Sequence, residues 1–141
     1  MKIASCSETL RKLYTNKYFP APDIVAEVHW ASKAETFHMK DDEKFLQKEE
    51  GVDIVPAWSL GLMISALPRV VSVCESDDPL EAVDYELHLY PAKPGEISRV
   101  AYVDAEGGLY YETIADELVD AVLKMIVLMD ETGEYDEPET L

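Results

Sequence analysis

The sequence has 141 residues and a mass of 15.9 kDa, the size of one ordinary domain that can bury a core of its own. It carries 12 basic and 29 acidic side chains, and the net charge of −17 argues against direct binding to nucleic acid or an anionic membrane, which both need a positive surface. No secretory signal begins the chain and no uncharged stretch reaches the about 20 residues of a membrane-spanning helix, so we expect a cytoplasmic protein.

The first 51 residues predict a short helix, a segment with two interpretations and an exposed connection. Ser5 and Glu8 have the spacing of a capping box, which predicts a helix near residues 6–16. Residues 23–39 alternate apolar and polar side chains as in a β-hairpin, whereas their Ala and Glu content leaves a helix open. The mixed-charge residues 40–51 predict an exposed loop or short helix.

The middle of the chain contains an apolar run between two prolines. Pro56 suits the first position of a helix and Pro68 forces a stop, so residues 57–67 are interpreted as a central, buried helix. Leu62 is expected to lie in its core-facing surface.

The remaining residues predict strands followed by the longest helix. Alternation over residues 85–90 and the apolar residues 70–73 and 98–103 predict strands, and residues 104–108 form a turn into another. Residues 114–130 predict a helix that is apolar except for one charged stripe.

Together these elements predict an α+β fold. We expect a single domain over residues 1–133, in which a mostly antiparallel sheet packs against two main helices, 57–67 and 114–130, with a short N-terminal helix. Residues 134–141 are expected to be an acidic, disordered tail. The apolar surface of the last helix makes a homodimer one interpretation of the fold.

Two groups of side chains were considered as sites, and neither supports an assignment. His29 and His38 would face each other if the hairpin turned at residues 33–34, and they could then bind zinc with Cys6 or Cys74. However, no metal-ligand spacing supports this, and the two cysteines form no disulfide framework. The carboxylates of Asp116 and Asp120 lie one helical turn apart, which is more typical of a solvated helix face than of a cation site.

No nucleophile or phosphate-binding motif is present, so we expect no enzyme, no cofactor and no catalytic or metal residues.

The segment Pro-Ala-Trp-Ser-Leu-Gly at residues 56–61, closed by Leu67 and Pro68, carries a resemblance to a known group. With the tyrosine-containing strands after it and residues 115–122 leading into an apolar helix, the chain resembles small uncharacterised proteins of prophages and mobile elements in gut Bacteroidetes. The resemblance covers residues 8–133 and implies an intracellular α+β domain with no assigned activity, so no site residue is transferred.

The predicted function is therefore that of a non-enzymatic, acidic accessory protein of a phage or mobile element that acts by binding another protein. One alternative is a DNA mimic that occupies the basic cleft of a host DNA-binding protein with rows of carboxylates. A second alternative is a small metal-binding or hydrolytic protein. The carboxylates proposed for the two rows are Glu75, Asp77, Asp78, Glu81, Asp84 and Glu86, and Asp116, Glu117 and Asp120.

Overall fold

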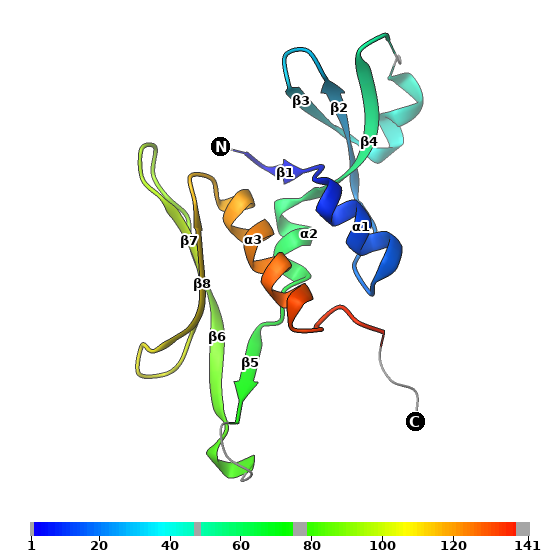
Figure 1. The fold of residues 1–141 in the computed structure, drawn as a ribbon. Helices are drawn as coiled ribbons and strands as arrows, with labels where there is room; N and C mark the ends of the chain where they lie inside the picture. Colours follow the sequence, from blue (N-terminus) through cyan, green and yellow to red (C-terminus); the bar gives the residue numbers. More distant parts are fainter. Residues whose placement is uncertain (1, 47–48, 75–78, 138–141) are drawn as a thin grey trace. The chain divides into compact units, whose positions relative to one another are not determined.

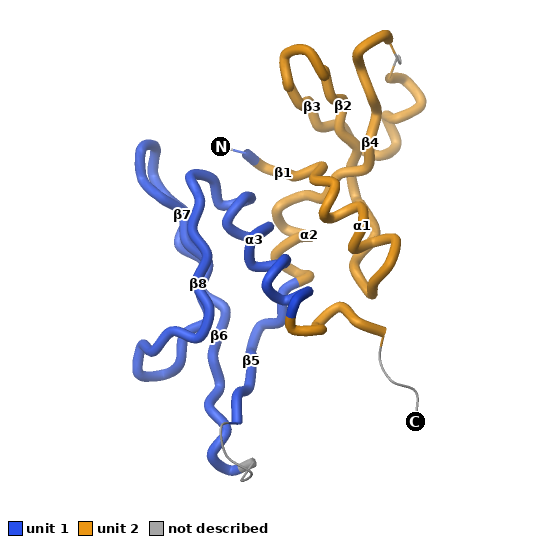
Figure 2. Tube along the Cα trace, in the orientation of Figure 1, with its two compact units in different colours: residues 1–2, 67–131 blue, residues 3–66, 132–141 orange. Residues whose placement is uncertain are grey.

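The computed structural model describes residues 2–46, 49–74 and 79–137 and has an α+β fold (Figure 1). The strands form two antiparallel sheets of four strands each, instead of the one sheet expected. The chain divides into two compact units (Figure 2): unit 1 contains residues 1–2 and 67–131, and unit 2 contains residues 3–66 and 132–141. Each sheet lies within one unit: β1 to β4 belong to unit 2, and β5 to β8 belong to unit 1.

The sheet of unit 2 has the order β1-β4-β2-β3. Of the hairpin and the helix that were both left open for residues 23–39, the structure has the hairpin: β2 (Ile24–His29) pairs with β3 (Ala34–Met39), and Lys33 adopts a positive φ of 60° in the turn between them. Helix α1 (Glu8–Asn16) is capped by Ser7, not by Ser5, because the Ser7 side chain accepts a hydrogen bond from the Thr9 N–H at 3.2 Å. A 3₁₀ helix, η1 (Lys40–Phe45), follows β3.

The helix predicted over residues 57–67 is wrong in its first part. Residues up to 59 belong to strand β4 (Val52–Ser59), which pairs with β2 along most of its length and with β1 (Ala4–Ser5) at its end. Pro56 is tolerated because β1 pairs only with the last two residues of β4, so the missing N–H faces the unpaired side. Helix α2 is confined to Leu60–Ser65, and its buried residue is Met63, while Leu62 is half-buried.

The core of unit 2 is built around Trp58. Its side chain is fully buried, its Nε1–H donates to the Pro20 carbonyl at 2.8 Å, and the rings of Tyr14 and Phe19 each lie 6.3 Å from its own. Edge and tilted ring contacts of this kind add to the apolar burial. The indole is therefore held by both packing and a hydrogen bond.

Residues 132–137, four of which were expected in the disordered tail, contribute to unit 2. Tyr135 is buried with a relative exposure of 4%; its ring packs edge-on against Phe19 at 5.1 Å, and its hydroxyl donates to the Ala66 carbonyl at 3.1 Å. The Tyr18 N–H donates to the Tyr135 carbonyl at 2.8 Å, and Lys17 forms an ion pair with Asp136. The rest of the expected tail, residues 138–141, lies outside the described residues.

Unit 1 consists of an antiparallel sheet with one long helix on it. The strands β5 (Val70–Val73), β6 (Val83–Tyr90), β7 (Ser98–Val103) and β8 (Leu109–Ala115) lie side by side in chain order, and a short 3₁₀ helix, η2 (Pro79–Glu81), precedes β6. Helix α3 (Leu118–Glu131) packs on β7 and β8. It begins four residues later than predicted, because β8 continues to Ala115 in order to pair with Ser98.

Buried apolar residues of α3 and β7 form the core of unit 1. Ile126 and Met125 are fully buried, as are Val100 and Tyr102 on the strand. Two polar side chains in this core form hydrogen bonds: the Tyr102 hydroxyl donates to the Pro68 carbonyl at 2.8 Å, and the Thr113 hydroxyl donates to the Ala121 carbonyl at 2.7 Å. Among the described residues, no helix is long and apolar enough to cross a membrane.

Candidate functional site

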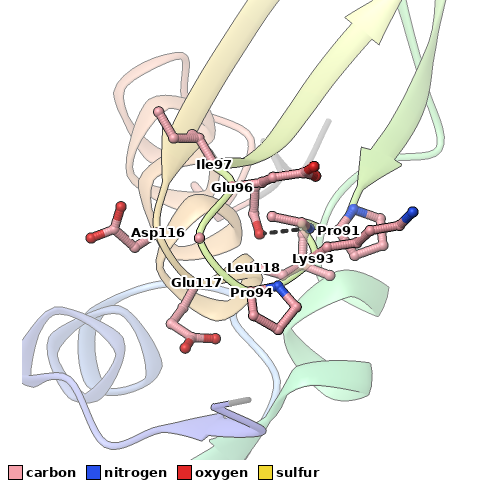
Figure 3. A pocket seen from close by; sticks show the side chains of 11 residues that line it. Pro91, Lys93, Pro94, Glu96, Ile97, Asp116, Glu117 and Leu118 are labelled. Atoms are coloured by element: carbon pink, nitrogen blue, oxygen red, sulfur yellow. Dashed lines mark hydrogen bonds between the residues drawn. The ribbon is translucent and has the colours of Figure 1, made fainter.

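An open pocket of about 640 Å³ lies in unit 1, at the end of the sheet where β7 begins and β8 ends (Figure 3). The β6–β7 loop, residues 91–97, and Ser98 at the start of β7 form one side of it, and residues 116–118, which lead into α3, form the other. Strands were predicted on both sides of this loop, but the pocket was not, although Pro91, Pro94 and Gly95 indicated a turn.

The loop is held in one conformation by two hydrogen bonds. The Glu96 N–H donates to the Lys93 carbonyl at 2.9 Å, which closes a turn around Pro94 and Gly95. Gly95 has a φ of +87°, as the third residue of a type II turn requires. The Ala92 N–H donates to the buried Ser98 hydroxyl at 3.1 Å. The rim of the pocket is therefore formed by ordered backbone.

The lining of the pocket is acidic and apolar. Three carboxylates, those of Glu96, Asp116 and Glu117, contribute to it, against the single ammonium group of Lys93. The apolar part comes from the two prolines, Ile97 and Leu118. An arrangement of this kind suits a ligand that combines a positive charge with an aliphatic chain.

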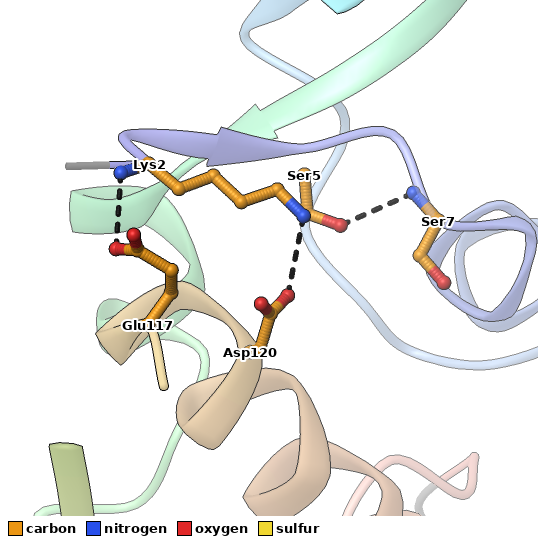
Figure 4. A network of polar contacts seen from close by, with 5 residues as sticks. All are labelled: Lys2, Ser5, Ser7, Glu117 and Asp120. Carbon is orange, nitrogen blue, oxygen red and sulfur yellow. Dashed lines mark hydrogen bonds and ion pairs between the residues drawn. The ribbon is translucent and has the colours of Figure 1, made fainter. Parts of the chain in front are cut away.

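A lysine of the same unit already contacts the carboxylates beside the pocket (Figure 4). The Lys2 backbone N–H donates to Glu117 Oε2 at 3.1 Å, and Lys2 Nζ donates to Asp120 Oδ1 at 3.3 Å. Asp116 and Asp120, which were expected on one face of a helix, have different surroundings: Asp116 precedes the helix and lines the pocket, whereas Asp120 contacts Lys2. The two carboxylates therefore do not form a common site.

The two histidines that were weighed and rejected as a zinc site both contact one carboxylate instead of facing each other. The hairpin turns over residues 30–33, so His29 pairs with Ala34 and His38 pairs with Val25. Glu27 lies between them, with Oε1 at 3.5 Å from His29 Nε2 and Oε2 at 3.2 Å from His38 Nε2. Searched over the residues that the structure describes, no group of three or more His, Cys, Asp and Glu side chains is arranged to hold a metal ion.

Cys6, one of the two cysteines considered beside these histidines, lies on the other face of this sheet. It packs against Ala26 and Val28, which alternate along β2 with the Glu27 and His29 positions. Burial, and then the charge and hydrogen bond of Glu35, raise the pKa of the Cys6 thiol to about 11. Cys6 is therefore a protonated thiol at neutral pH and a poor nucleophile.

We expect this environment to protect Cys6 from alkylation. At pH 8 the folded protein should react with iodoacetamide at Cys6 at least about tenfold more slowly than at the exposed Cys74, because the thiolate is the reactive form. The Cys6 rate should rise between pH 9 and pH 11, and Glu35→Gln should increase it at pH 8. Mass spectrometry of timed samples measures both sites, with Glu27→Gln on the opposite face as the control. Equal rates at pH 8 would contradict the prediction.

The exposed face of the unit 1 sheet carries a polar network that sequence reasoning did not find. The Arg99 guanidinium stacks on the Tyr90 ring at 4.2 Å, and its Nη1 lies 3.3 Å from Glu112 Oε2. Tyr90 and His88 are linked by a 3.3 Å hydrogen bond. The alternation of polar residues along β6 and β7 indicates that one face of the sheet is polar. Which of these side chains are neighbours depends on the pairing register, which the sequence alone does not give.

Near the other end of this sheet, tyrosines gather on β6 and β8. The rings of Tyr85 and Tyr110 are 5.1 Å apart, and those of Tyr110 and Tyr111 are 4.3 Å apart. A hydrogen bond with Tyr110 raises the pKa of Tyr111. The rings are too close to one another to leave room for a ligand between them, so we interpret the cluster as packing.

The two carboxylate rows expected of a DNA mimic are only partly described. Glu75, Asp77 and Asp78 lie outside the described residues. Asp84 accepts a hydrogen bond from the Ser72 hydroxyl at 2.5 Å, and Glu86 lies 3.8 Å from His88. In the second row, Glu117 and Asp120 are engaged by Lys2.

Comparison of the chain with protein-family models, with curated proteins and with solved structures finds no match. The resemblance to proteins of Bacteroidetes mobile elements therefore stays a prediction.

Proposed function

We propose that this protein is a non-enzymatic binding protein that recognises a basic segment of another protein, as an accessory protein of a phage or mobile element would. The contact site in this proposal is the pocket between the β6–β7 loop and the start of α3. The observation that carries it is the combination of three carboxylates with an ordered, proline-rich rim in one pocket.

The charge of unit 1 supports a basic partner. Residues 1–2 and 67–131 contain five basic and 15 acidic side chains, which gives this unit a net charge of −10. A field of one sign raises the association rate with oppositely charged partners and disfavours acidic ones. The negative charge of unit 1 therefore favours a basic partner, and three of its carboxylates lie together in the lining of the pocket.

The lining favours lysine or arginine side chains over a simple cation. The carboxylates of Glu96 and Asp116 can accept charged hydrogen bonds, while Pro94 and Ile97 can cover the aliphatic stems. The ammonium group of Lys2 contacts Asp120, three residues after the pocket residue Glu117, and is an example within unit 1 of an amine held beside the pocket. An ordered rim lowers the entropy cost of binding.

The negative charge of unit 1 is weaker support for the alternative function, a DNA mimic, than for a protein that binds a basic segment. Rows of uninterrupted carboxylates are needed to imitate a phosphate backbone. In this structure Glu112 pairs with Arg99 and Asp120 pairs with Lys2, so cations interrupt the acidic surface. We therefore prefer a basic peptide segment as the ligand.

The pocket is tested with a short peptide and a charge-matched control. The pentapeptide acetyl-Gly-Lys-Arg-Lys-Gly-amide should shift the NMR signals of residues 91–98 and 116–118. Replacing Glu96 by glutamine and Asp116 by asparagine should weaken this binding about tenfold, because each exposed ion pair contributes at most about 1 kcal/mol.

The control variant, Glu106→Gln with Glu134→Gln, removes the same charge from exposed positions that do not line the pocket. It should change the affinity less than about twofold. Equal effects of the two double variants would show that only net charge matters, and the absence of shifts at residues 91–98 and 116–118 would remove the pocket from the proposal.

A further inference from the structure

We propose that the basic segment binds as an additional β-strand on the open edge of β8 and continues from there into the pocket. This inference rests on the proposed function and names the surface along which the partner lies. Its two components are an unprotected strand edge and an acidic run of sequence on the same edge.

Strand β8 ends the strand order of its sheet, so one side of it pairs with β7 and no described strand pairs with the other. Every second residue of such an edge strand directs its N–H and C=O away from the sheet. The register skips Tyr110 opposite the pair Tyr102 and Val103, where the ladder is irregular. The regular part of the edge is therefore Tyr111 to Ala115, the part next to the pocket.

This edge has few of the features that normally prevent strand addition. It contains no proline and no lysine, and it exposes large apolar side chains. The exposed fractions are 53% for Leu109, 40% for Tyr110 and 47% for Ile114. The other edge strands of the two sheets, β1, β3 and β5, are shorter than the seven residues of β8, with two, six and four residues.

One lysine does contact the edge. Lys124 Nζ, from α3, donates to the Ile114 carbonyl at 2.7 Å. An ammonium group thus occupies a backbone acceptor of the edge strand, in the way that edge lysines discourage pairing. A backbone N–H of an added strand would have to replace this hydrogen bond, so Lys124 should act against binding.

The negative charge along this edge favours a basic segment over a second copy of the chain. Residues 104–120 contain six acidic and no basic side chains. Glu112, which pairs with Arg99, lies within the regular part of the edge, and the pocket carboxylates of Asp116 and Glu117 follow it. A second copy of this chain would bring the same acidic residues to the edge and would be repelled, whereas a basic segment would be attracted.

The dimensions fit a peptide of ordinary length. A strand advances about 3.3 Å per residue, so the five regular residues of β8 extend over about 17 Å. A decapeptide can therefore pair along this edge and still place its remaining residues at the pocket. Main-chain hydrogen bonds would supply affinity, and the pocket would supply selectivity for positive charge.

The test compares three acetylated decapeptides. The first alternates lysine with valine, the second has proline at every valine position, and the third has glutamate at every lysine position. The lysine–valine peptide should bind at least about tenfold more tightly than the lysine–proline peptide, which has the same charge but cannot form a strand ladder. It should also slow amide hydrogen exchange at residues 111–115, and the glutamate peptide should not bind.

Two variants examine the edge itself. Lys124→Met should strengthen binding of the lysine–valine peptide more than Lys12→Met does, because both remove one positive charge but only Lys124 contacts β8. Equal strengthening by the two variants would show that Lys124 acts through charge alone and would overturn the role given to the edge.

The outcomes separate this inference from the proposed function. If the lysine–valine and lysine–proline peptides bind equally and shift only residues 91–98 and 116–118, strand addition is overturned while the pocket remains. If neither these peptides nor the pentapeptide binds, both proposals fail. Protection of residues 111–115 in the free protein together with dimer formation would identify a second copy as the occupant and would overturn the proposal.

Discussion

Replacing Trp58 by alanine is expected to lower the free energy of unfolding by about 3–5 kcal/mol. The side chain is fully buried in unit 2, contacts the rings of Tyr14 and Phe19, and donates a hydrogen bond to the Pro20 carbonyl. Alanine would leave a cavity that these neighbours fill only in part, and the carbonyl would lose its partner. Urea denaturation followed by far-UV circular dichroism measures the change.

The matched control is Trp30→Ala. Trp30 is 57% exposed, and its indole N–H donates to Asp53 at 2.8 Å on the surface. We expect a loss of less than about 1 kcal/mol, as is usual for an exposed position. Equal losses for the two tryptophan variants would mean that the burial of Trp58 is not what stabilises unit 2.

The second large effect is expected in unit 1, for Ile126→Ala. Ile126 is fully buried in α3 beneath the sheet, and removing an isoleucine side chain from such a site costs about 2–5 kcal/mol. The same substitution at Ile97, which is 60% exposed, should change stability by about 0.5 kcal/mol or less. Urea titrations of both variants, followed by circular dichroism, measure the difference.

The two tryptophans make this experiment more informative. Both belong to unit 2, so tryptophan fluorescence follows unit 2, whereas circular dichroism follows both units. If Ile126→Ala changes the circular dichroism transition and leaves the fluorescence transition in place, the two units unfold separately. If neither transition moves, the core position of Ile126 is contradicted.

The sequence predicted those elements whose signal is local. The hairpin of β2 and β3 and the strands β6 and β7 follow from alternation, which reports directly on a sheet with two different faces. Residues 57–59 were assigned to a helix because a short apolar run has no period that separates a buried strand from a buried helix. Residues 57–59 form a strand because they pair with β2 and β1, and these partners are more than 20 positions away in the sequence.

The sites were harder to predict because they depend on register and on loops. A turn over residues 30–33 instead of 33–34 shifts the pairing of His29 by four residues, which places Glu27 between the histidines. The pocket requires the β6–β7 loop and the start of α3 to meet, and only the pairing of Ser98 with Ala115 shows that they do. The composition predicts that the protein is acidic, but it does not predict which carboxylates lie together in the fold.

The burial of Tyr135 has a consequence for the order in which the chain can fold during synthesis. Residues 3–66 of unit 2 are made first, but Phe19, Ala66 and Tyr18 receive their partner only after residue 135 has been added. Domains usually fold in the order in which they leave the ribosome. Here the core of unit 2 is completed only after residues 132–137 have been made, so unit 2 cannot finish folding before unit 1 has been synthesised.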